Sequence, residues 1–542
     1  MKDDDMAESA ASLGQQIRET EAQLRQGGGA AAVERQNAKG RLFVRERLRL
    51  LLDRDSPWLE LGLWNGWGMY DAWGGAPAAG VVCGIGRIAG RRHMVIANDA
   101  TVKAGAFFPA TAKKVLRAQK VAVQNRLPLV YLVDSAGVFL PLQEDVFPDE
   151  DDFGRIFRNN AVISASGLPQ IAAIMGNCVA GGGYLPVLCD KVLMTDGSGL
   201  YLAAPALVKS AIGQEVSSEE LGGALVHAEV SGTIDYREPD DPSCLARVRR
   251  LCAVAPPDSP QPPPPFARLN AANPERPPED LEQLVTIDGR REYEVTDVLR
   301  CVVDAGSFDE YKAEYGRTIV CGTARIGGFP VGIVANEHHR VRPAEGPIQF
   351  GGVMYVDSAE KAARFVMNCN QDWLPILFLQ DVNGFMVGRE SERAGIIKAG
   401  AKLVSAISNS RVPKLTIVTG GSFGAGNYAL CGKAFDPRFI FAWPTGRIAV
   451  MGSQQATSTL LDITVKSLKR SGDEIDAAQL ERLRETVQGD YERQMDVRYA
   501  AARGWIDAIL EPARTREVLI GCLEIVTRYA ADEPFKVGVF QV

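Results

Sequence analysis

Residues 127–134 read Leu-Pro-Leu-Val-Tyr-Leu-Val-Asp, and residues 374–381 read Leu-Pro-Ile-Leu-Phe-Leu-Gln-Asp, so one octapeptide pattern recurs in the two halves of the chain. Two other pairs of stretches recur in the same order along the chain: residues 82–90 with 320–328, and residues 169–176 with 413–420. Three matched segments in one order are not a chance event. The sequence therefore predicts a tandem duplication of one fold.

Each copy has the pattern of an α/β fold. Short apolar runs at 129–133, 171–175, 377–379 and 415–419 are followed by Gly-rich turns and then by segments with helical periodicity. Runs of this kind are typical of buried parallel strands that cross over to helices. A single long doubly wound sheet would not explain the repeat.

A Pro-rich stretch divides the two copies. Residues 256–265 contain seven prolines, and Pro274, Pro277 and Pro278 follow; proline neither continues a helix nor occupies a central strand. A chain of 542 residues also exceeds the size of one hydrophobic core. We expect a first domain over residues 1–254 that begins with a helical segment, a stiff linker over 255–278, and a second domain over 279–542.

Composition excludes several classes of protein. The net charge is −7, which gives no global basic field for nucleic acid, and no apolar run approaches the roughly 20 residues that span a bilayer. The ten cysteines form no Cys-x-x-Cys pair, and the first residues are acidic, unlike a signal or transit peptide. We expect a cytoplasmic, bacterial protein with reduced thiols, no nucleic-acid partner and no insertion into a membrane.

Familiar catalytic motifs are missing from the sequence. The four histidines lack metal-ligand spacing, so we expect no metal, and the pair His338-His339 is interpreted as a surface loop. The sequence contains neither a Gly-x-Ser-x-Gly elbow with a partner histidine nor a phosphate-binding Gly-x-x-x-x-Gly-Lys-Ser/Thr loop. Conspicuous instead are two matched Gly-rich turns, residues 176–184 and 420–428.

These turns favour the binding of anions by the backbone. Glycine lets a main chain approach a ligand closely, and the N–H groups at a helix start converge with the positive end of the helix dipole. Such a place serves as a phosphate cradle or an oxyanion hole. The alternative is that the glycines only permit close packing of helix and strand, and duplication would copy a packing detail as readily as a site.

At this point the chain resembles a known family, the carboxyltransferase β subunits of biotin-dependent acyl-CoA carboxylases, and most of all the methylcrotonyl-CoA and geranyl-CoA carboxylase branch. The matching stretches extend from about residue 40 to about 530: residues 41–53, 98–103, 133–135, Leu140-Pro141, Asp145-Val146-Phe147-Pro148-Asp149, Phe153-Gly154-Arg155-Ile156-Phe157, 213–224 and Gly384-Phe385-Met386-Val387-Gly388.

The resemblance implies two crotonase-like domains of the ClpP/crotonase type and a hexameric core with biotin-bearing α subunits around it. Carboxybiotin would release CO2, its ureido anion would take a proton from the acyl-CoA, and the enolate would attack the CO2. A first hole at Gly181, Gly182 and Gly183 would hold the thioester oxygen. A second hole would hold the biotin ureido oxygen, and the residues expected there are Gly424, Ala425 and Gly426, with Phe423 and Tyr428 contacting biotin.

Coenzyme A would be the carrier of the substrate, and we expect Lys103, Gly105, Lys113 and Arg117 to contact it. Lys113 and Arg117 share one face of a predicted basic helix, which suits phosphate groups, although a solvated surface is the commoner meaning of such a face. Asp134 and Asp381, equivalent in the repeat, are interpreted as structural acids at strand ends.

The chain contains no Ala-Met-Lys-Met biotinylation site and no nucleotide-binding loop of a biotin carboxylase, so we expect a separate biotin carboxylase/biotin carrier α subunit. Two other functions stay open. Residues 336–350 resemble the corresponding region of glutaconyl-CoA decarboxylase α subunits, which favours decarboxylation of an acyl-CoA. A crotonase-like hydratase or a non-catalytic scaffold is the third possibility, although no paired carboxylates follow either turn.

Overall fold

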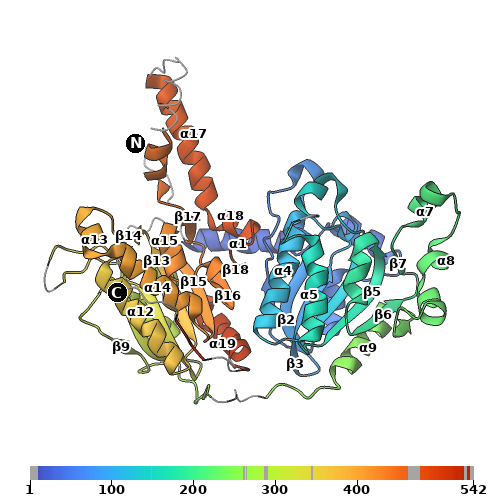
Figure 1. Ribbon diagram of the computed structural model, residues 1–542, viewed down its shortest axis with the longest axis horizontal. Coiled ribbons are helices and arrows are strands. Elements are labelled where there is room, and N and C mark those ends of the chain that lie inside the picture. The colour runs from blue at the N-terminus through green and yellow to red at the C-terminus, as the bar shows by residue number, and fades with distance from the viewer. Residues whose placement is uncertain are drawn as a thin grey trace. The chain divides into compact units, whose positions relative to one another are not determined.

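The structure is a computed structural model, and it describes residues 10–147, 149–259, 263, 265–285, 291–343, 346–453, 455–461, 465, 477–529 and 534–537. It forms two compact units (Figure 1). The N-terminal unit comprises residues 18–260 with 502–504, and the C-terminal unit comprises 261–501 and 505–542 with 1–17. The chain thus passes between units within the Pro-rich stretch, of which residues 260–262 and 264 lie outside the described part.

The N-terminal unit is built on an eight-stranded sheet. Its order is β1-β2-β3-β4-β5-β6-β8, with β7 paired to the end of β5. The strands are β1 (Leu59–Leu61), β2 (Val81–Ile88), β3 (Arg91–Asn98), β4 (Leu129–Ser135), β5 (Gln170–Val179), β6 (Lys191–Thr195), β7 (Gly199–Tyr201) and β8 (Tyr236–Glu238). Strands β1 to β3 are antiparallel, and pairing from β3 onward is parallel. The parallel strands β4 to β6 have the apolar, buried sequences that are typical of such sheets.

Helices cover this sheet. Figure 1 shows α4 and α5 side by side against the strands of the N-terminal unit, while α3 and α9 pack together with the core residues Val130, Leu132 and Leu193. The helices that follow residue 18 are α2 (Ala30–Asn37), α3 (Val44–Leu51), α4 (Pro109–Gln124), α5 (Phe153–Ala165), α6 (Tyr184–Val187), α7 (Pro205–Ile212), α8 (Ser218–Gly222) and α9 (Asp241–Cys252). They are preceded by α1 (Ala10–Leu24), and the three glycines at 27–29 lie between α1 and α2.

The C-terminal unit repeats this sheet strand for strand. Its order is β18-β16-β15-β13-β11-β10-β9, with β17 paired to the end of β15. The strands are β9 (Asp309–Tyr311), β10 (Ile319–Ile326), β11 (Phe329–Asn336), β13 (Ile376–Val382), β15 (Lys414–Phe423), β16 (Phe439–Ala442), β17 (Arg447–Ala449) and β18 (Ala508–Ile509). An additional pair, β12 (Val353–Met354) and β14 (Gly384–Phe385), lies outside this sheet. The predicted duplication of one α/β fold is confirmed.

Helices α12 and α14 pack against each other over the C-terminal sheet, around the core residues Phe365, Val366 and Leu403. The described helices of this unit are α10 (Leu281–Leu284), α11 (Val295–Val302), α12 (Val356–Gln371), α13 (Arg389–Ala394), α14 (Ile396–Asn409), α15 (Gly424–Ala429), α17 (Ala477–Met495), α18 (Val497–Ala502) and α19 (Thr515–Val526). None of the described helices is both long and apolar enough to cross a membrane.

The repeat extends to buried polar side chains. Lys114 on α4 donates to the carbonyl of Val81 at 2.6 Å, and Lys361 on α12 donates to the carbonyl of Ile319 at 2.9 Å. Because burial penalises the charged amine, the pKa of each lysine is lowered from its ordinary value. A buried lysine is tolerated where carbonyl groups take its protons, and both copies use it to tie a helix to the first long strand.

Candidate active site

The first Gly-rich turn is anchored to an acid at the end of the neighbouring strand. Asp134 lies at the end of β4, and its Oδ1 accepts the backbone N–H of Asn177 at 3.2 Å. The turn lies so close that a Cβ atom on Gly176 would overlap the Asp134 carboxylate. This first glycine is therefore required by the acid beneath it.

The second turn repeats the arrangement. Asp381 lies near the end of β13, its Oδ1 accepts the backbone N–H of Gly421 at 2.8 Å, and a Cβ atom on Gly420 would overlap its carboxylate. The backbone N–H of each acid in turn donates to an asparagine at the end of the adjacent strand, Asn98 for Asp134 and Asn336 for Asp381. Both acids are buried, in agreement with their interpretation as structural acids.

The groups that neutralise the two acids differ. Oδ2 of Asp134 accepts Nε2 of Gln36 at 2.9 Å and Nη1 of Arg47 at 3.3 Å, and Nη1 of Arg41 lies 4.0 Å from Oδ1. Arg47 is buried and also bonds Asp241 at 2.8 Å and the carbonyl of Met175 at 2.7 Å. The first acid is thus held by guanidinium groups and an amide.

Asp381 is held by an imidazole and a phenol. Nδ1 of His338 lies 2.6 Å from its Oδ2, and the hydroxyl of Tyr293 donates to the same oxygen at 2.9 Å. Burial opposes the charge on Asp381, but the hydrogen bond and charge of His338, with the Gly421 N–H and Tyr293, hold the pKa of this carboxyl below its usual range. His338 and His339 lie in a loop, as predicted, but His338 is mostly buried against Asp381 rather than on the surface, and His339 pairs with Glu337 at 2.9 Å.

The predicted donors of the first turn lie in a short 3₁₀ segment, Ala180–Gly183, that leads into α6. A Cβ on Gly182 would meet nothing nearer than the Gly137 Cα at 3.9 Å, so the local structure has room for a side chain there. A Cβ on Gly183 would come within 3.3 Å of Leu200. Packing therefore gives a reason for a glycine at 183 but not at 182.

The second turn contains the start of α15. Gly424, Ala425 and Gly426 form its first turn, where N–H groups have no acceptor within the helix. Gly424 has a φ of 52°, and a Cβ on Gly426 would press on Val382, so both glycines have local structural reasons. Phe423 is buried, whereas Tyr428 is half exposed beside Phe435, with ring centroids 5.9 Å apart.

A polar network supports the second turn from below. The hydroxyl of Ser422 donates to Gln380 at 2.6 Å, and Asn427 donates to the Ser422 hydroxyl at 2.8 Å. At the place of Ser422 the first turn has Cys178, whose sulfur lies 3.4 Å from the carbonyl oxygen of Gly182. Each turn is therefore fixed by the residue two positions after its first glycine.

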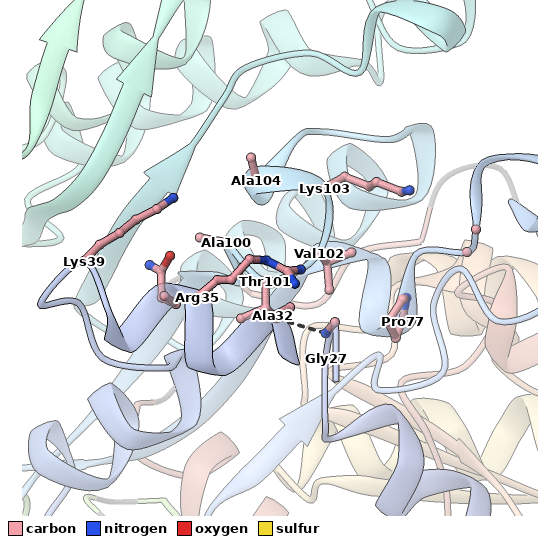
Figure 2. A pocket seen from close by; sticks show the side chains of 14 residues that line it. Gly27, Ala32, Arg35, Lys39, Pro77, Ala100, Thr101, Val102, Lys103 and Ala104 are labelled. Atoms are coloured by element: carbon pink, nitrogen blue, oxygen red, sulfur yellow. Dashed lines mark hydrogen bonds between the residues drawn. The ribbon is translucent and has the colours of Figure 1, made fainter. Parts of the chain in front are cut away.

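A basic pocket of about 500 Å³ lies in the N-terminal unit (Figure 2). Its lining includes Arg35 and Lys39 from the end of α2 and beyond, and Lys103 from the segment that follows β3. Gly28 donates its N–H to the Thr101 hydroxyl at 2.9 Å across the floor. Lys103 and Ala104 both have left-handed backbones, with φ of 46° and 53°, a strain that proteins keep mainly at functional sites.

Two chains of contacts connect this pocket to the first turn. Gln36 lines the pocket and bonds Asp134, which holds the turn. The carbonyl of Ala104, also in the lining, accepts the N–H of Ala136, which directly follows β4. A ligand in the pocket would therefore contact Gln36, which bonds Asp134, and Ala104, which bonds the residue after β4.

The residues expected to contact CoA are only partly brought together. Lys103 lines the pocket, whereas Lys113 and Arg117 on α4 do not. Gly105 packs against the end of β4, where a Cβ would overlap the Asp134 carbonyl. Sequence reasoning missed Arg35 and Lys39; their spacing of four along a helix was the available signal. The described residues contain no group of three or more His, Cys, Asp or Glu side chains that could hold a metal.

Comparison with known proteins gives the family. Residues 35–537 match the carboxyl transferase domain. The beta1 subunit of the biotin-dependent 3-methylcrotonyl-coenzyme A carboxylase of Mycobacterium tuberculosis is 43% identical over 517 residues, which cover 95% of this chain and 94% of that protein. A probable mitochondrial methylcrotonoyl-CoA carboxylase beta chain of Drosophila melanogaster is 42% identical over 553 residues, which cover 99% and 92%.

A solved structure agrees with these relatives. The beta subunit of geranyl-CoA carboxylase from P. aeruginosa superposes with a TM-score of 0.85 at 36% identity, covering 99% of this chain and 96% of that one. The chain therefore belongs to the carboxyl transferase family, as a carboxyltransferase of the biotin-dependent acyl-CoA carboxylases. The resemblance to the methylcrotonyl-CoA and geranyl-CoA branch, and with it the crotonase-like fold, is confirmed.

Proposed function

We propose that this chain transfers CO2 between biotin carried on a partner subunit and a branched enoyl-CoA, 3-methylcrotonyl-CoA or a close analogue. The observation that carries the proposal is the duplicated turn. Each unit places a Gly-rich backbone over a buried acid, at the equivalent position of its own sheet. A reaction with two separate oxyanions needs two such places. The substrate class follows from the relatives, which are named for 3-methylcrotonyl-CoA and geranyl-CoA.

Biotin supplies the carboxyl group and the base, which is consistent with a site that lacks a side-chain nucleophile. The chain's own part is to hold charge and to orient the substrate. The N–H groups of the first turn, at Gly181, Gly182 and Gly183, would hold the thioester oxygen, and those of Gly424, Ala425 and Gly426 the ureido oxygen. One backbone donor aimed at an oxyanion contributes about 3 kcal/mol at the transition state.

The basic pocket fits the phosphate groups of CoA. Arg35, Lys39 and Lys103 are exposed cations around one hollow, and cations with backbone N–H groups are what polyphosphates bind. Gln36 and Ala104 line the pocket and also bond residues at the end of β4. A CoA molecule bound in the pocket would therefore have its acyl group near the first turn. Lys113 and Arg117 remain candidates for more distant parts of CoA.

Biotin must then arrive on another polypeptide, and we propose a biotin carboxylase/biotin carrier α subunit and a hexameric core of this chain. The support is the resemblance to β subunits that are named as parts of such carboxylases. Covalently bound biotin on the isolated chain, detected by avidin blotting, would contradict this assignment.

The test is reconstitution. The chain is purified with its partner from the native host, and ATP-dependent incorporation of labelled bicarbonate is measured with 3-methylcrotonyl-CoA, geranyl-CoA and propionyl-CoA. We expect the highest kcat/KM with a branched enoyl-CoA. Biotin-dependent decarboxylation of glutaconyl-CoA without ATP, or hydration of an enoyl-CoA by the chain without biotin, would replace the proposal with the corresponding alternative.

A further inference from the structure

We propose that His338 and Tyr293 are positioning residues that act through Asp381 on the second turn, so that this turn responds to protonation of an imidazole while the first turn does not. The inference depends on the proposed function in one respect, the assignment of the second turn to biotin. The coupling between His338 and the turn stands on geometry alone.

The first step is that Asp381 fixes the turn. One carboxylate oxygen accepts the Gly421 N–H at 2.8 Å; the other accepts the Tyr293 hydroxyl at 2.9 Å and lies 2.6 Å from Nδ1 of His338. Because Gly420 lies directly on this carboxylate, a rotation of the carboxylate would displace the turn backbone. A change at His338 therefore reaches residues 420–426 through one shared side chain.

The second step is that His338 is itself held in place. The ring of Tyr293 stacks on the His338 ring, with centroids 4.7 Å apart and an interplanar angle of 11°. Glu337 accepts the backbone N–H groups of His338 at 2.8 Å and of Val295, at the start of α11, at 3.1 Å. The imidazole thus has a fixed orientation toward Asp381, which is a condition for a positioning role.

The third step concerns charge. In the described part of the chain, the titratable groups that contact His338 or its neighbours are Tyr293, Glu337, His339 and Asp381. Burial raises the pKa of Tyr293 well above its ordinary value, so this residue stays a hydroxyl donor, and burial also raises the pKa of Glu337. A protonated imidazole adds attraction between opposite charges to its contact with the Asp381 carboxylate, and a neutral imidazole lacks this attraction.

The N-terminal unit supplies an internal comparison. Asp134 occupies the place of Asp381, but the cations near it are the guanidinium groups of Arg47 and Arg41 rather than an imidazole. We therefore expect the position of the second turn to change with pH and the position of the first turn to stay the same.

Hydrogen exchange of the full chain tests the coupling without any activity assay. Protection factors, corrected for intrinsic rates, are measured for residues 420–426 and 176–183 between pH 5.5 and 8.5. We expect protection of 420–426 to fall about tenfold as the imidazole loses its proton, with 176–183 unchanged. His338→Asn retains a donor near Nδ1 without the charge, so protection of residues 420–426 in this variant should be independent of pH. His227→Asn, in the N-terminal unit, is the control and should leave the profile of residues 420–426 as in wild type. A flat profile for wild-type 420–426, or an unchanged profile in His338→Asn, overturns the proposal.

Steady-state kinetics of the complex with the biotin-carrying partner adds the functional reading. Tyr293→Phe should raise KM for the biotinylated partner about tenfold and leave KM for acyl-CoA within twofold. Tyr131→Phe removes an equally buried hydroxyl in the other unit and should change neither. Equal rises in both KM values would show a general loss of structure and contradict a positioning role. Absence of carboxyl transfer in the wild type would refute the proposed function, and the exchange experiment would still decide this inference.

Discussion

Asp134 and Asp381 occupy equivalent positions at the ends of β4 and β13, and each accepts a backbone N–H from the residue after the first glycine of its turn, Asn177 and Gly421. The acids are structural in both copies, yet they place the segments that we propose to be catalytic. Stability and activity can therefore be separated within one turn by choosing which glycine is changed.

Gly176→Ala and Gly420→Ala should destabilise their units. The new Cβ would overlap the carboxylate of Asp134 or Asp381, and relief requires movement of a buried charge. We expect a loss of about 1–3 kcal/mol or more in the free energy of unfolding, measured from urea midpoints. Gly154→Ala is the control, because a Cβ there meets nothing within 4 Å. If the two variants match the control, the assigned contact is wrong.

Gly182→Val should reduce activity without unfolding the protein. The structure has room for the side chain, which would occupy the approach to the first turn. Carboxylation of acyl-CoA should fall about 10²- to 10³-fold, while steps that need only biotin survive. Gly154→Val tests for a general effect of valine. Near-normal turnover of a folded Gly182→Val variant would exclude the first turn as the oxyanion hole.

Lys103→Ala and Arg35→Ala should each raise KM for acyl-CoA about three- to tenfold with little change in kcat, because they remove cations that bind the non-reacting phosphates. The effect should shrink at high salt. Lys120→Ala removes an exposed lysine of α4 outside the pocket and should have no effect. Unchanged KM values in both pocket variants would show that CoA binds outside this pocket.

Asp304 should contribute stability that disappears in acid. It accepts the N–H groups of Gly327 and Gly328 at 2.8 Å and Arg516 at 2.7 Å. Burial opposes its charge, but Arg516 and the two N–H groups outweigh burial and hold the pKa of the carboxyl below its ordinary 3.8. The stabilisation that Asp304 contributes is therefore complete above pH 3.8, the ordinary pKa. It is lost as the pH falls through the lower pKa that Asp304 has in the folded protein.

Asp304→Asn should accordingly lower the free energy of unfolding by about 1.5–3 kcal/mol at pH 7, and the difference from wild type should narrow below about pH 4. Urea unfolding between pH 3 and 7 measures this. Asp151→Asn, at an exposed position, should run parallel to wild type throughout. A constant difference at all pH values would mean that the Asp304 charge does not contribute.

Subunit exchange should restore activity if two chains complete one site. CO2 and a proton pass between two bound groups, so the two turns that act together must be near each other. Gly182→Val is expected to inactivate the first turn; for the second, Ala425→Pro deletes the N–H of the second residue of α15. Mixing the two inactive variants should recover part of the activity. No recovery, with exchange verified by mass, would place each complete site within one chain.

The fold could be predicted because duplication is visible in sequence order. Three matched segments defined the strands β2, β4 and β5 and their copies, and the Gly-rich turns followed directly. What the sequence could not predict is which side chains meet across long separations. Gln36 and Arg47 reach Asp134, and Arg35 reaches the pocket of Lys103, through a packing of α2 and α3 that no local pattern encodes.

The histidines show the same limit more sharply. His338 lies in a loop after β11, and local propensity says nothing about the Asp381 carboxylate that contacts it from β13. Its counterpart region in the first copy ends at Asp99, which bonds Thr101 instead. The two copies kept the acid and exchanged the group that neutralises it, and only the three-dimensional contacts reveal this.

The buried guanidinium of Arg47 also dictates when the first unit can be completed during synthesis. Its partners lie at Asp134, Met175 and Asp241, so they emerge from the ribosome progressively later than α3 itself. Until Asp241 is available, docking of α3 would bury a positive charge without its best partner, which is strongly unfavourable. We therefore expect nascent chains that end before residue 241 to leave α3 undocked and sensitive to protease, and chains that extend past α9 to acquire resistance in a single late step.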